Sequence, residues 1–203
     1  MPILRIRRIW FLQILKMSNL PISQLSDNII SSDSLIISAL EIQHRILELS
    51  NQIKADFEGK DILVIAVLKG AFMFAADLVR KLQKLGLNVE IDFIKVSSYG
   101  SNTNSSKGVK IELDIKSSIT DKNILLLDDI IDTGHTISFL CRHLESQSVR
   151  SLSTCVLLDK PHRREVDFKI DYVGFEVSDM FVVGYGLDHN ERYRCLPDIS
   201  HIG

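Results

Sequence analysis

The chain has 203 residues, a formal net charge of −2 and 45% hydrophobic residues. This length is enough for one domain with a substantial core, and the composition excludes disordered, collagen-like and disulfide-rich classes. A nearly neutral chain gives no electrostatic sign of nucleic-acid binding, so we expect a small-molecule ligand and no nucleic-acid partner. The three cysteines, Cys141, Cys155 and Cys195, are far apart and lack metal-ligand spacing. They are typical of free thiols in a reducing compartment, and we therefore expect a cytoplasmic protein.

The N-terminal stretch MPILRIRRIWFLQILKM combines three arginines with an apolar run and so imitates a signal peptide. The apolar run is short for that role, and no small-residue cleavage site follows it. It is also far too short to span a bilayer, so we expect no membrane partner. We interpret residues 1–16 as an extension upstream of a start at Met17 or as a helical appendage, and residues 17–203 as one domain.

The first predicted element of the domain is a helix over residues 33–57, where apolar side chains recur at helical spacing. Ser34, or Ser38 with Glu41 three residues later, can cap its start through a side-chain oxygen. The helix should end before the polar break at residues 58–60, which separates it from the next apolar run.

Strand and helix patterns then alternate. Residues 61–68 form a continuous apolar run, typical of a strand buried on both faces, and the helix after it ends at Gly86. The alternation predicts an α/β fold around a mainly parallel sheet flanked by helices. The predicted buried face of this second helix consists of Phe72, Ala75, Ala76, Val79, Leu82 and Leu85. Further strands are predicted at residues 89–96, 109–113, 123–129, 152–158, 171–177 and 180–186, and a third helix carries Ile137, Leu140, Cys141 and Leu144.

Ligands of open parallel sheets bind beyond the carboxyl ends of strands, where loops lead into helices. The first such junction is Leu68-Lys69-Gly70, where a lysine and helix-start amides can receive an anion. An ordinary turn with a solvated lysine remains the alternative for this junction considered alone.

The second junction lies in the stretch ILLLDDIIDTGHTI, residues 124–137. Two acids, Asp128 and Asp129, end the predicted strand, and a loop with hydroxyls, a glycine and exposed helix-start amides can wrap a monophosphate. The spacing fits neither a Walker loop nor a dinucleotide fingerprint. The carboxylates suit a sugar diol or Mg²⁺, and the loop suits a phosphate, so a ribose phosphate would match both the acids and the loop. The alternative is that a loop residue caps the helix and that Asp128 and Asp129 lie in solvent. The loop residues are Asp132, Thr133, Gly134, His135 and Thr136.

At this point the sequence resembles type I phosphoribosyltransferases, and in particular their hypoxanthine-guanine branch. The stretch LLLDDIIDTGHT looks like the phosphoribosyl diphosphate signature of that family. The resemblance covers about residues 34–200 and extends through several motifs in the family's order. These motifs are VLKGAFMFAADLVR, VSSYGSNTNSSKGVKI, LLDKPHRR, DYVGFEV, FVVGYGLDHNERYR and LPDI.

The resemblance implies the type I phosphoribosyltransferase fold, with a small hood lobe over a purine site formed by about residues 160–203 and the N-terminal helix region. It implies an enzyme of purine salvage that transfers the 5-phosphoribosyl group from phosphoribosyl diphosphate to hypoxanthine or guanine, giving IMP or GMP and pyrophosphate. It further implies Mg²⁺ as cofactor and a homodimer or homotetramer. A regulator of the same fold that binds nucleotides without turnover is the alternative.

The resemblance also implies roles for individual residues. Asp132 matches the proton acceptor near purine N7, and Lys160 matches the residue that binds the exocyclic oxygen of 6-oxopurines. Asp128 stands where the family often has glutamate, and His135 where many relatives have lysine, so we interpret its imidazole as incidental. The Leu68–Lys69 bond can be cis in the family.

The remaining implied roles fall into five groups. The phosphoribosyl site would consist of Asp128, Asp129, Thr133, Gly134, His135 and Thr136, and the pyrophosphate site of Lys69, Gly70 and Arg194. The purine site would add Phe181, Val182 and Asp188 to Asp132 and Lys160, and the metal would be held by Asp128, Asp129 and Asp188. Ser98 and Tyr99 would lie at the base of a lid.

Overall fold

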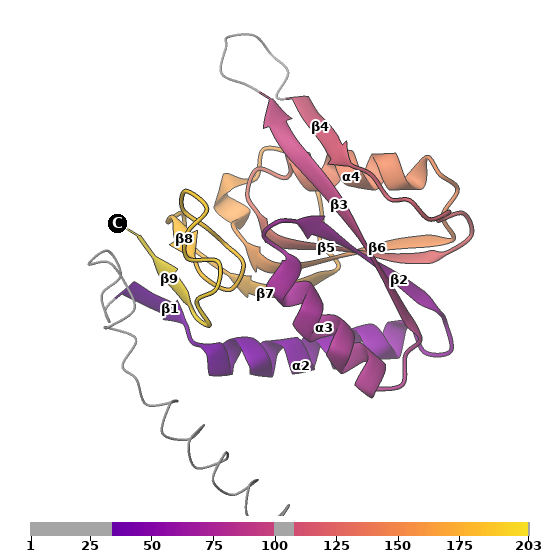
Figure 1. Cartoon of the computed structure of the whole chain (residues 1–203), viewed down its shortest axis with the longest axis horizontal. Helices are drawn as coiled ribbons and strands as arrows, with labels where there is room; N and C mark the ends of the chain where they lie inside the picture. Colours follow the sequence, from indigo (N-terminus) through magenta and orange to yellow (C-terminus); the bar gives the residue numbers. More distant parts are fainter. Residues whose placement is uncertain (1–33, 100–107, 203) are drawn as a thin grey trace, which may run out of the picture.

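The computed structural model describes residues 34–99 and 108–202 (Figure 1). The predicted N-terminal extension, residues 1–16, and most of the predicted lid lie outside the described residues. No helix in the described ranges is both long enough and apolar enough to cross a membrane. In chain order the elements are β1 (Leu35–Ile37), α2 (Ala39–Asp56), β2 (Ile62–Leu68), α3 (Phe72–Lys84), β3 (Val89–Tyr99), β4 (Gly108–Leu113), β5 (Asn123–Ile131), α4 (His135–Glu145), β6 (Ser151–Asp159), the 3₁₀ helix η3 (Pro161–Arg163), β7 (Tyr172–Glu176), β8 (Val182–Val183) and β9 (Ile199–His201).

A six-stranded sheet forms the centre of the molecule, in the order β4-β3-β2-β5-β6-β7. All neighbouring strands are parallel except β3 and β4, which are antiparallel. Alternate residues of β2 contribute to two cores on opposite faces: Val64 packs with residues of α2 and α3, and Leu63 with residues of α4. Because both faces are covered, the central strands are continuous apolar runs, and the predicted α/β fold is confirmed.

A second, three-stranded antiparallel sheet has the order β1-β9-β8 and forms the hood (Figure 1). It joins a strand that precedes the first helix to two strands from the C-terminal part of the chain. The backbone N–H of Ala39, at the start of α2, donates to Asp198 Oδ1 at 2.6 Å and ties the helix to this sheet.

The prediction of a helix from residue 33 is wrong for its first residues, because residues 35–37 pair with β9 as a strand. The helix begins at Ala39, where Ser38 has extended backbone angles and forms a capping box with Glu41. Of the two caps considered from the sequence, Ser38 is therefore the one used.

Two further predictions need correction. Ala76 was expected on the buried face of α3 but is exposed; the helix is rotated so that Phe74 and Leu78 enter the core instead. Strand β5 does not end at Asp129, because Ile130 and Ile131 continue to pair with β6. The acid pair therefore lies within the last part of a strand.

Candidate active site

The candidate site lies at the carboxyl edge of the main sheet, where β2, β5 and β6 end side by side. Parallel pairing makes this convergence unavoidable, since strands that run together end together. Ile131 is paired with Asp159, so the next residues, Asp132 and Lys160, leave adjacent strands together. A cavity of about 240 Å³ opens here and is lined by Val67, Asp128–Gly134, Thr136 and Ile137.

The loop after β2 approaches the end of β5 closely. The Leu68–Lys69 peptide bond is cis. A Cβ atom on Gly70 would lie 1.6 Å from Asp129 Oδ2, so any side chain at this position would displace the Asp129 carboxylate. A Cβ atom on Gly186, in the turn after β8, would lie 2.0 Å from the Gly70 carbonyl oxygen. Three segments that are far apart in sequence are thus in direct contact.

The acid pair Asp128 and Asp129 is inside the site and not in solvent. The backbone N–H of Asp129 donates to Asp128 Oδ1 at 3.0 Å, and that of Ile130 donates to Asp129 Oδ1 at 2.9 Å. Burial raises the pKa of both carboxyls, and the charge of Asp129 raises the pKa of Asp128 further. A cation at this position would compensate the two charges, so the pair fits a divalent metal.

No group of three or more His, Cys, Asp or Glu side chains gathers into a metal cage among the described residues. Mg²⁺ does not need such a cage, since it commonly binds one or two carboxylates together with water and substrate phosphates. The arrangement at Asp128 and Asp129 therefore suits a metal that arrives with a diphosphate.

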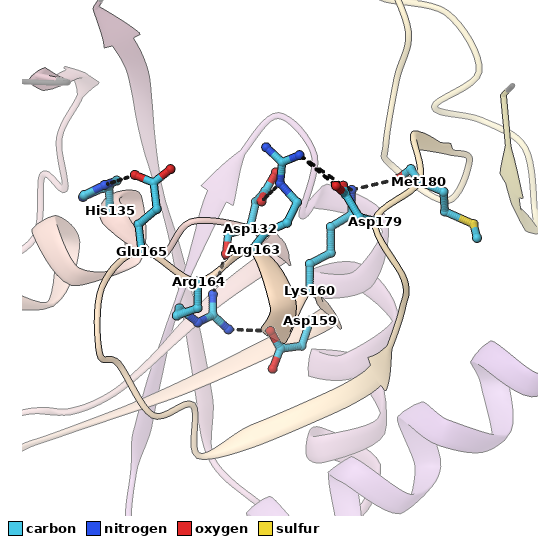
Figure 2. Close-up of polar contacts among 9 residues, drawn as sticks. All are labelled: Asp132, His135, Asp159, Lys160, Arg163, Arg164, Glu165, Asp179 and Met180. Carbon is cyan, nitrogen blue, oxygen red and sulfur yellow. Dashed lines mark hydrogen bonds and ion pairs between the residues drawn. The ribbon is translucent and has the colours of Figure 1, made fainter.

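The loop from Asp132 to Thr136 leads directly into α4. Gly134 has φ +88° and occupies the position before the helix, and Thr136 and Ile137 of the first helical turn line the cavity, where helix-start amides suit an anion. The backbone N–H groups of Glu165 and Val166 donate to the Thr133 carbonyl oxygen at 3.0 and 3.2 Å. The His135 imidazole contacts Glu165 Oε2 at 2.9 Å through Nε2 (Figure 2). Its incidental role in ligand binding stays a prediction.

Two arginines that received no role from the sequence hold Asp132 (Figure 2). Arg163 Nε donates to Asp132 Oδ1 at 2.6 Å, and its Nη1 lies 3.1 Å from Asp179 Oδ1. Arg164 Nη1 donates to the Asp132 carbonyl oxygen at 2.9 Å, and its Nη2 donates to the Asp159 carboxylate. Both arginines belong to the motif LLDKPHRR, and this motif is the sequence feature that could have indicated a place in the site.

Lys160 is buried next to the end of β5, with only 8% of its surface exposed. Its backbone N–H donates to the Ile131 carbonyl oxygen at 3.0 Å, and its Nζ donates to the Met180 carbonyl oxygen at 2.7 Å. A solvated lysine is thereby excluded. The ammonium instead points between the main sheet and the hood, where Asp179 Oδ1 lies 4.0 Å away (Figure 2).

Phe181 and Val182 occupy the start of the hood. Val182 is buried in β8, whereas Phe181 is 54% exposed, so the alternative of a core phenylalanine is excluded. The Phe181 ring meets the His189 ring edge to face, with centroids 5.3 Å apart. An aromatic face left exposed beside a buried lysine can receive a flat ligand.

The turn after β8 brings several charged groups together. Lys69 Nζ lies 3.1 Å from Glu191 Oε2, and Arg194 Nη2 lies 3.3 Å from the same oxygen. Arg194 Nη2 also lies 2.7 Å from Asp188 Oδ1, and Nη1 donates to the Gly186 carbonyl oxygen. Arg194 Nε is buried without a hydrogen-bond partner among the described residues. Two cations from distant segments thus converge, and Glu191, which the sequence reasoning missed, holds both.

Ser98 and Tyr99 are the last two residues of β3 and pair with Val109 and Gly108 of β4. The sequence between these strands, residues 100–107, is outside the described part of the chain. The expectation of a lid there stays a prediction.

Together, a parallel sheet with an acid pair, a helix-start loop and converging cations at its carboxyl edge defines an α/β enzyme site for a phosphorylated sugar. Residues 38–190 match the phosphoribosyl transferase domain, and the chain belongs to this family. The chain is 43% identical over 169 residues to a hypoxanthine phosphoribosyltransferase of Escherichia coli, covering 82% of this chain and 93% of that protein. It is 45% identical over 168 residues to a hypoxanthine-guanine phosphoribosyltransferase of Bacillus subtilis, covering 83% and 92%.

Solved structures give the same result. A crystal structure of a hypoxanthine-guanine phosphoribosyltransferase from Bacillus anthracis aligns with a TM-score of 0.79 and 48% identity, covering 83% of this chain and 98% of that one. A hypoxanthine phosphoribosyltransferase from Trypanosoma cruzi aligns with a TM-score of 0.79 and 39% identity, covering 83% and 94%. The resemblance drawn from the sequence motifs is confirmed.

Proposed function

We propose that this protein is a purine-salvage enzyme that transfers the 5-phosphoribosyl group from phosphoribosyl diphosphate to hypoxanthine and guanine, releasing pyrophosphate. The observation that carries this proposal is the placement of Asp132 and Lys160, which directly follow the ends of the adjacent strands β5 and β6. Asp132 also begins the loop that lines the cavity and suits a phosphate. A 6-oxopurine presents its N7 and its exocyclic oxygen on one edge, so a proton acceptor and a cation placed side by side match that edge.

Selection of the base follows from hydrogen-bond chemistry at Lys160. An ammonium group has three donors and no acceptor, so it stabilises a 6-oxo group and leaves a 6-amino group without a partner. The Phe181 face and the buried Val182 would hold the ring from the hood side. This arrangement favours hypoxanthine and guanine over adenine.

The phosphoribosyl group would lie across the cavity at the end of β5. Amides and hydroxyls of residues 133–136 suit the 5-phosphate, while Asp128 and Asp129 suit the ribose hydroxyls. Lys69, Gly70 and Arg194 suit the pyrophosphate. The buried Nε of Arg194 has no hydrogen-bond partner in the described part of the chain and is a donor suited to an anion. Fixed donors and cations would hold the two substrates in place and stabilise the charge that develops as they react. These two effects would supply most of the rate acceleration.

Asp128, Asp129 and Asp188 are the residues that would hold Mg²⁺. When bound, the metal would neutralise the pyrophosphate and so make it a better leaving group. Asp188 currently contacts Arg194, and its Oδ2 accepts the Glu191 backbone N–H at 2.8 Å, so it also orients the pyrophosphate arginine.

We further propose a cytoplasmic homodimer or homotetramer without nucleic-acid or membrane partners. Cys141 and Cys155 are buried free thiols in this structure, which supports a reducing compartment. Light scattering coupled to size exclusion would give the oligomeric state.

The Asp132→Asn variant tests the assigned chemistry. Loss of the proton acceptor should lower the rate of IMP formation by about 10²- to 10⁴-fold, because general base catalysis typically contributes that much. IMP affinity, measured by calorimetry, should change only a few-fold. The matched control is Asp121→Asn at the opposite edge of the sheet, where Asp121 pairs with Arg150 in solvent. Wild-type protein that binds IMP without any turnover would instead support the non-catalytic alternative.

A further inference from the structure

Arg164 is a partly buried arginine of the site, with a side chain only 16% exposed. Its guanidinium contacts residues from two different strand ends (Figure 2). Nη1 donates to the Asp132 carbonyl oxygen at 2.9 Å, just after β5, and Nη2 donates to the carboxylate of Asp159, the last residue of β6. The Asp159 side chain is also largely buried, at 12% exposure. One side chain thus clamps two adjacent strand ends.

The residues held by Arg164 adjoin the two groups assigned to base recognition. The Asp132 carboxylate is the proposed proton acceptor for the purine. Lys160, proposed to bind the exocyclic oxygen, directly follows Asp159 in the chain. A purine must contact both groups at once, so their separation has to match the spacing of N7 and the 6-oxygen on the base. The planar guanidinium has its donors in a fixed fork, which makes it suited to setting such a separation.

The phosphate part of the loop is held by other contacts. The backbone N–H groups of Glu165 and Val166 bind the Thr133 carbonyl oxygen, and neither contact uses the Arg164 side chain. The arginine stem passes against Gly134, where an added Cβ atom would lie 3.0 Å from Arg164 Cδ. Loss of the guanidinium should therefore disturb the base-recognition pair more than the phosphate loop.

From this geometry we propose that Arg164 is a positioning residue that fixes Asp132 relative to Lys160 and so sets the affinity for the purine base. The proposal rests on the proposed function of the site. It assigns Arg164 no contact with substrate; the residue acts through the Asp132 backbone and the Asp159 carboxylate.

Steady-state kinetics of Arg164→Gln with each substrate varied in turn tests this proposal. The KM for hypoxanthine should rise by about 10- to 100-fold, because misplacing a recognition group by about 1 Å has effects of that size. The KM for phosphoribosyl diphosphate should stay within about threefold, since the Thr133 contacts remain. The matched control, Arg150→Gln, removes another arginine–aspartate pair at the opposite edge of the sheet and should leave both KM values unchanged.

The Asp159→Asn variant supplies a second readout that a merely structural role would not give. If Arg164 acts by joining Asp159 to Asp132, both single variants should raise the same KM, and the double variant should be no worse than Arg164→Gln. If Arg164→Gln does not fold, Arg164→Lys replaces it, because lysine keeps the charge but lacks the fork, and the same selective rise is expected.

Two results would overturn the proposal. An active wild type together with a folded variant in which both KM values are unchanged, or rise equally, would overturn this inference alone. A wild type that forms no IMP under any condition would overturn the proposed function together with it.

Discussion

At Gly70 a single added methyl group would collide with a carboxylate of the site. The collision is with Asp129, at 1.6 Å from its Oδ2, in a turn whose own carbonyl oxygen lies against Gly186. Alanine at this position would therefore displace the Asp129 carboxylate from its place beside the turn.

We therefore expect Gly70→Ala to lower kcat/KM for phosphoribosyl diphosphate by at least about 100-fold, since displacement of Asp129 by about 1 Å would disrupt the site proposed for the ribose. Steady-state kinetics would check this. Gly59→Ala is the control: its φ is +73° and nothing lies within 4 Å of the added Cβ. That variant should lose about 1 kcal/mol of unfolding free energy and keep full activity. Equal activity of the two variants would contradict the close-approach account.

At the scale of single residues, the sequence motifs predicted which positions gather at the sheet edge but not what they contact. By its chemistry alone Lys160 is typical of a solvated lysine, and only its motif indicated a role in the site. The structure shows that the side chain is buried. The two contacts of Arg163 and the shared contact of Glu191 depend on loop geometry, which no spacing rule encodes. These residues were consequently missed.

At the scale of elements, Asp77 joins two helices and the hood turn. Its carboxylate accepts from Gln43 of α2 at 2.7 Å, from the Tyr185 hydroxyl after β8 at 2.5 Å, and from Arg80 one turn along α3. Burial by itself would raise the pKa of Asp77, but these hydrogen bonds outweigh burial and lower it below the usual range. Burial, and after it the hydrogen bond to Asp77, raises the pKa of Tyr185.

A lowered pKa in the folded state means that the ionised carboxylate stabilises the fold above the unfolded pKa of about 4. This stabilisation is lost as the pH falls through the lower folded pKa. We expect Asp77→Asn to melt several degrees below wild type at pH 7, since about 1 to 2 kcal/mol of hydrogen bonding to a charged group is weakened.

Thermal melts across pH 2 to 7 would check this prediction, if both proteins unfold reversibly. The difference in melting temperature between wild type and Asp77→Asn should become smaller as the pH falls. The control is Asp167→Asn, at an exposed residue, and its melting temperature should equal that of wild type at every pH. A gap that stays constant or widens in acid would show that the charge of Asp77 does not stabilise the junction.

Helix and strand patterns predicted most elements because apolar periodicity reflects which face is buried. The failures lie where a distant partner decides the outcome. Residues 35–37 are a strand only because β9 pairs with them, and β5 extends past its acids only because β6 continues beside it. On the predicted face of α3, Ala75 and Leu82 are buried as expected, but Ala76 is exposed and the core contains Phe74 and Leu78.

At the scale of the whole molecule, parallel pairing brings three separate stretches of sequence together at one site, and the turn after β8 adds a fourth. The loops after β2, β5 and β6 meet because their strands run in one direction, and this much the α/β pattern predicted. The hood sheet was less accessible to sequence reasoning, because its three short strands come from both ends of the described chain. Only the resemblance indicated a separate hood lobe.

A panel of four bases tests the proposed reaction most directly. Purified protein with phosphoribosyl diphosphate and Mg²⁺ would receive hypoxanthine, guanine, xanthine or adenine, and pyrophosphate release would be followed for each. The Lys160 ammonium predicts release with hypoxanthine and guanine and a rate for adenine at least about 100-fold lower, because a 6-amino group finds no acceptor there. No release with any of the four bases, or a preference for adenine, would contradict the account.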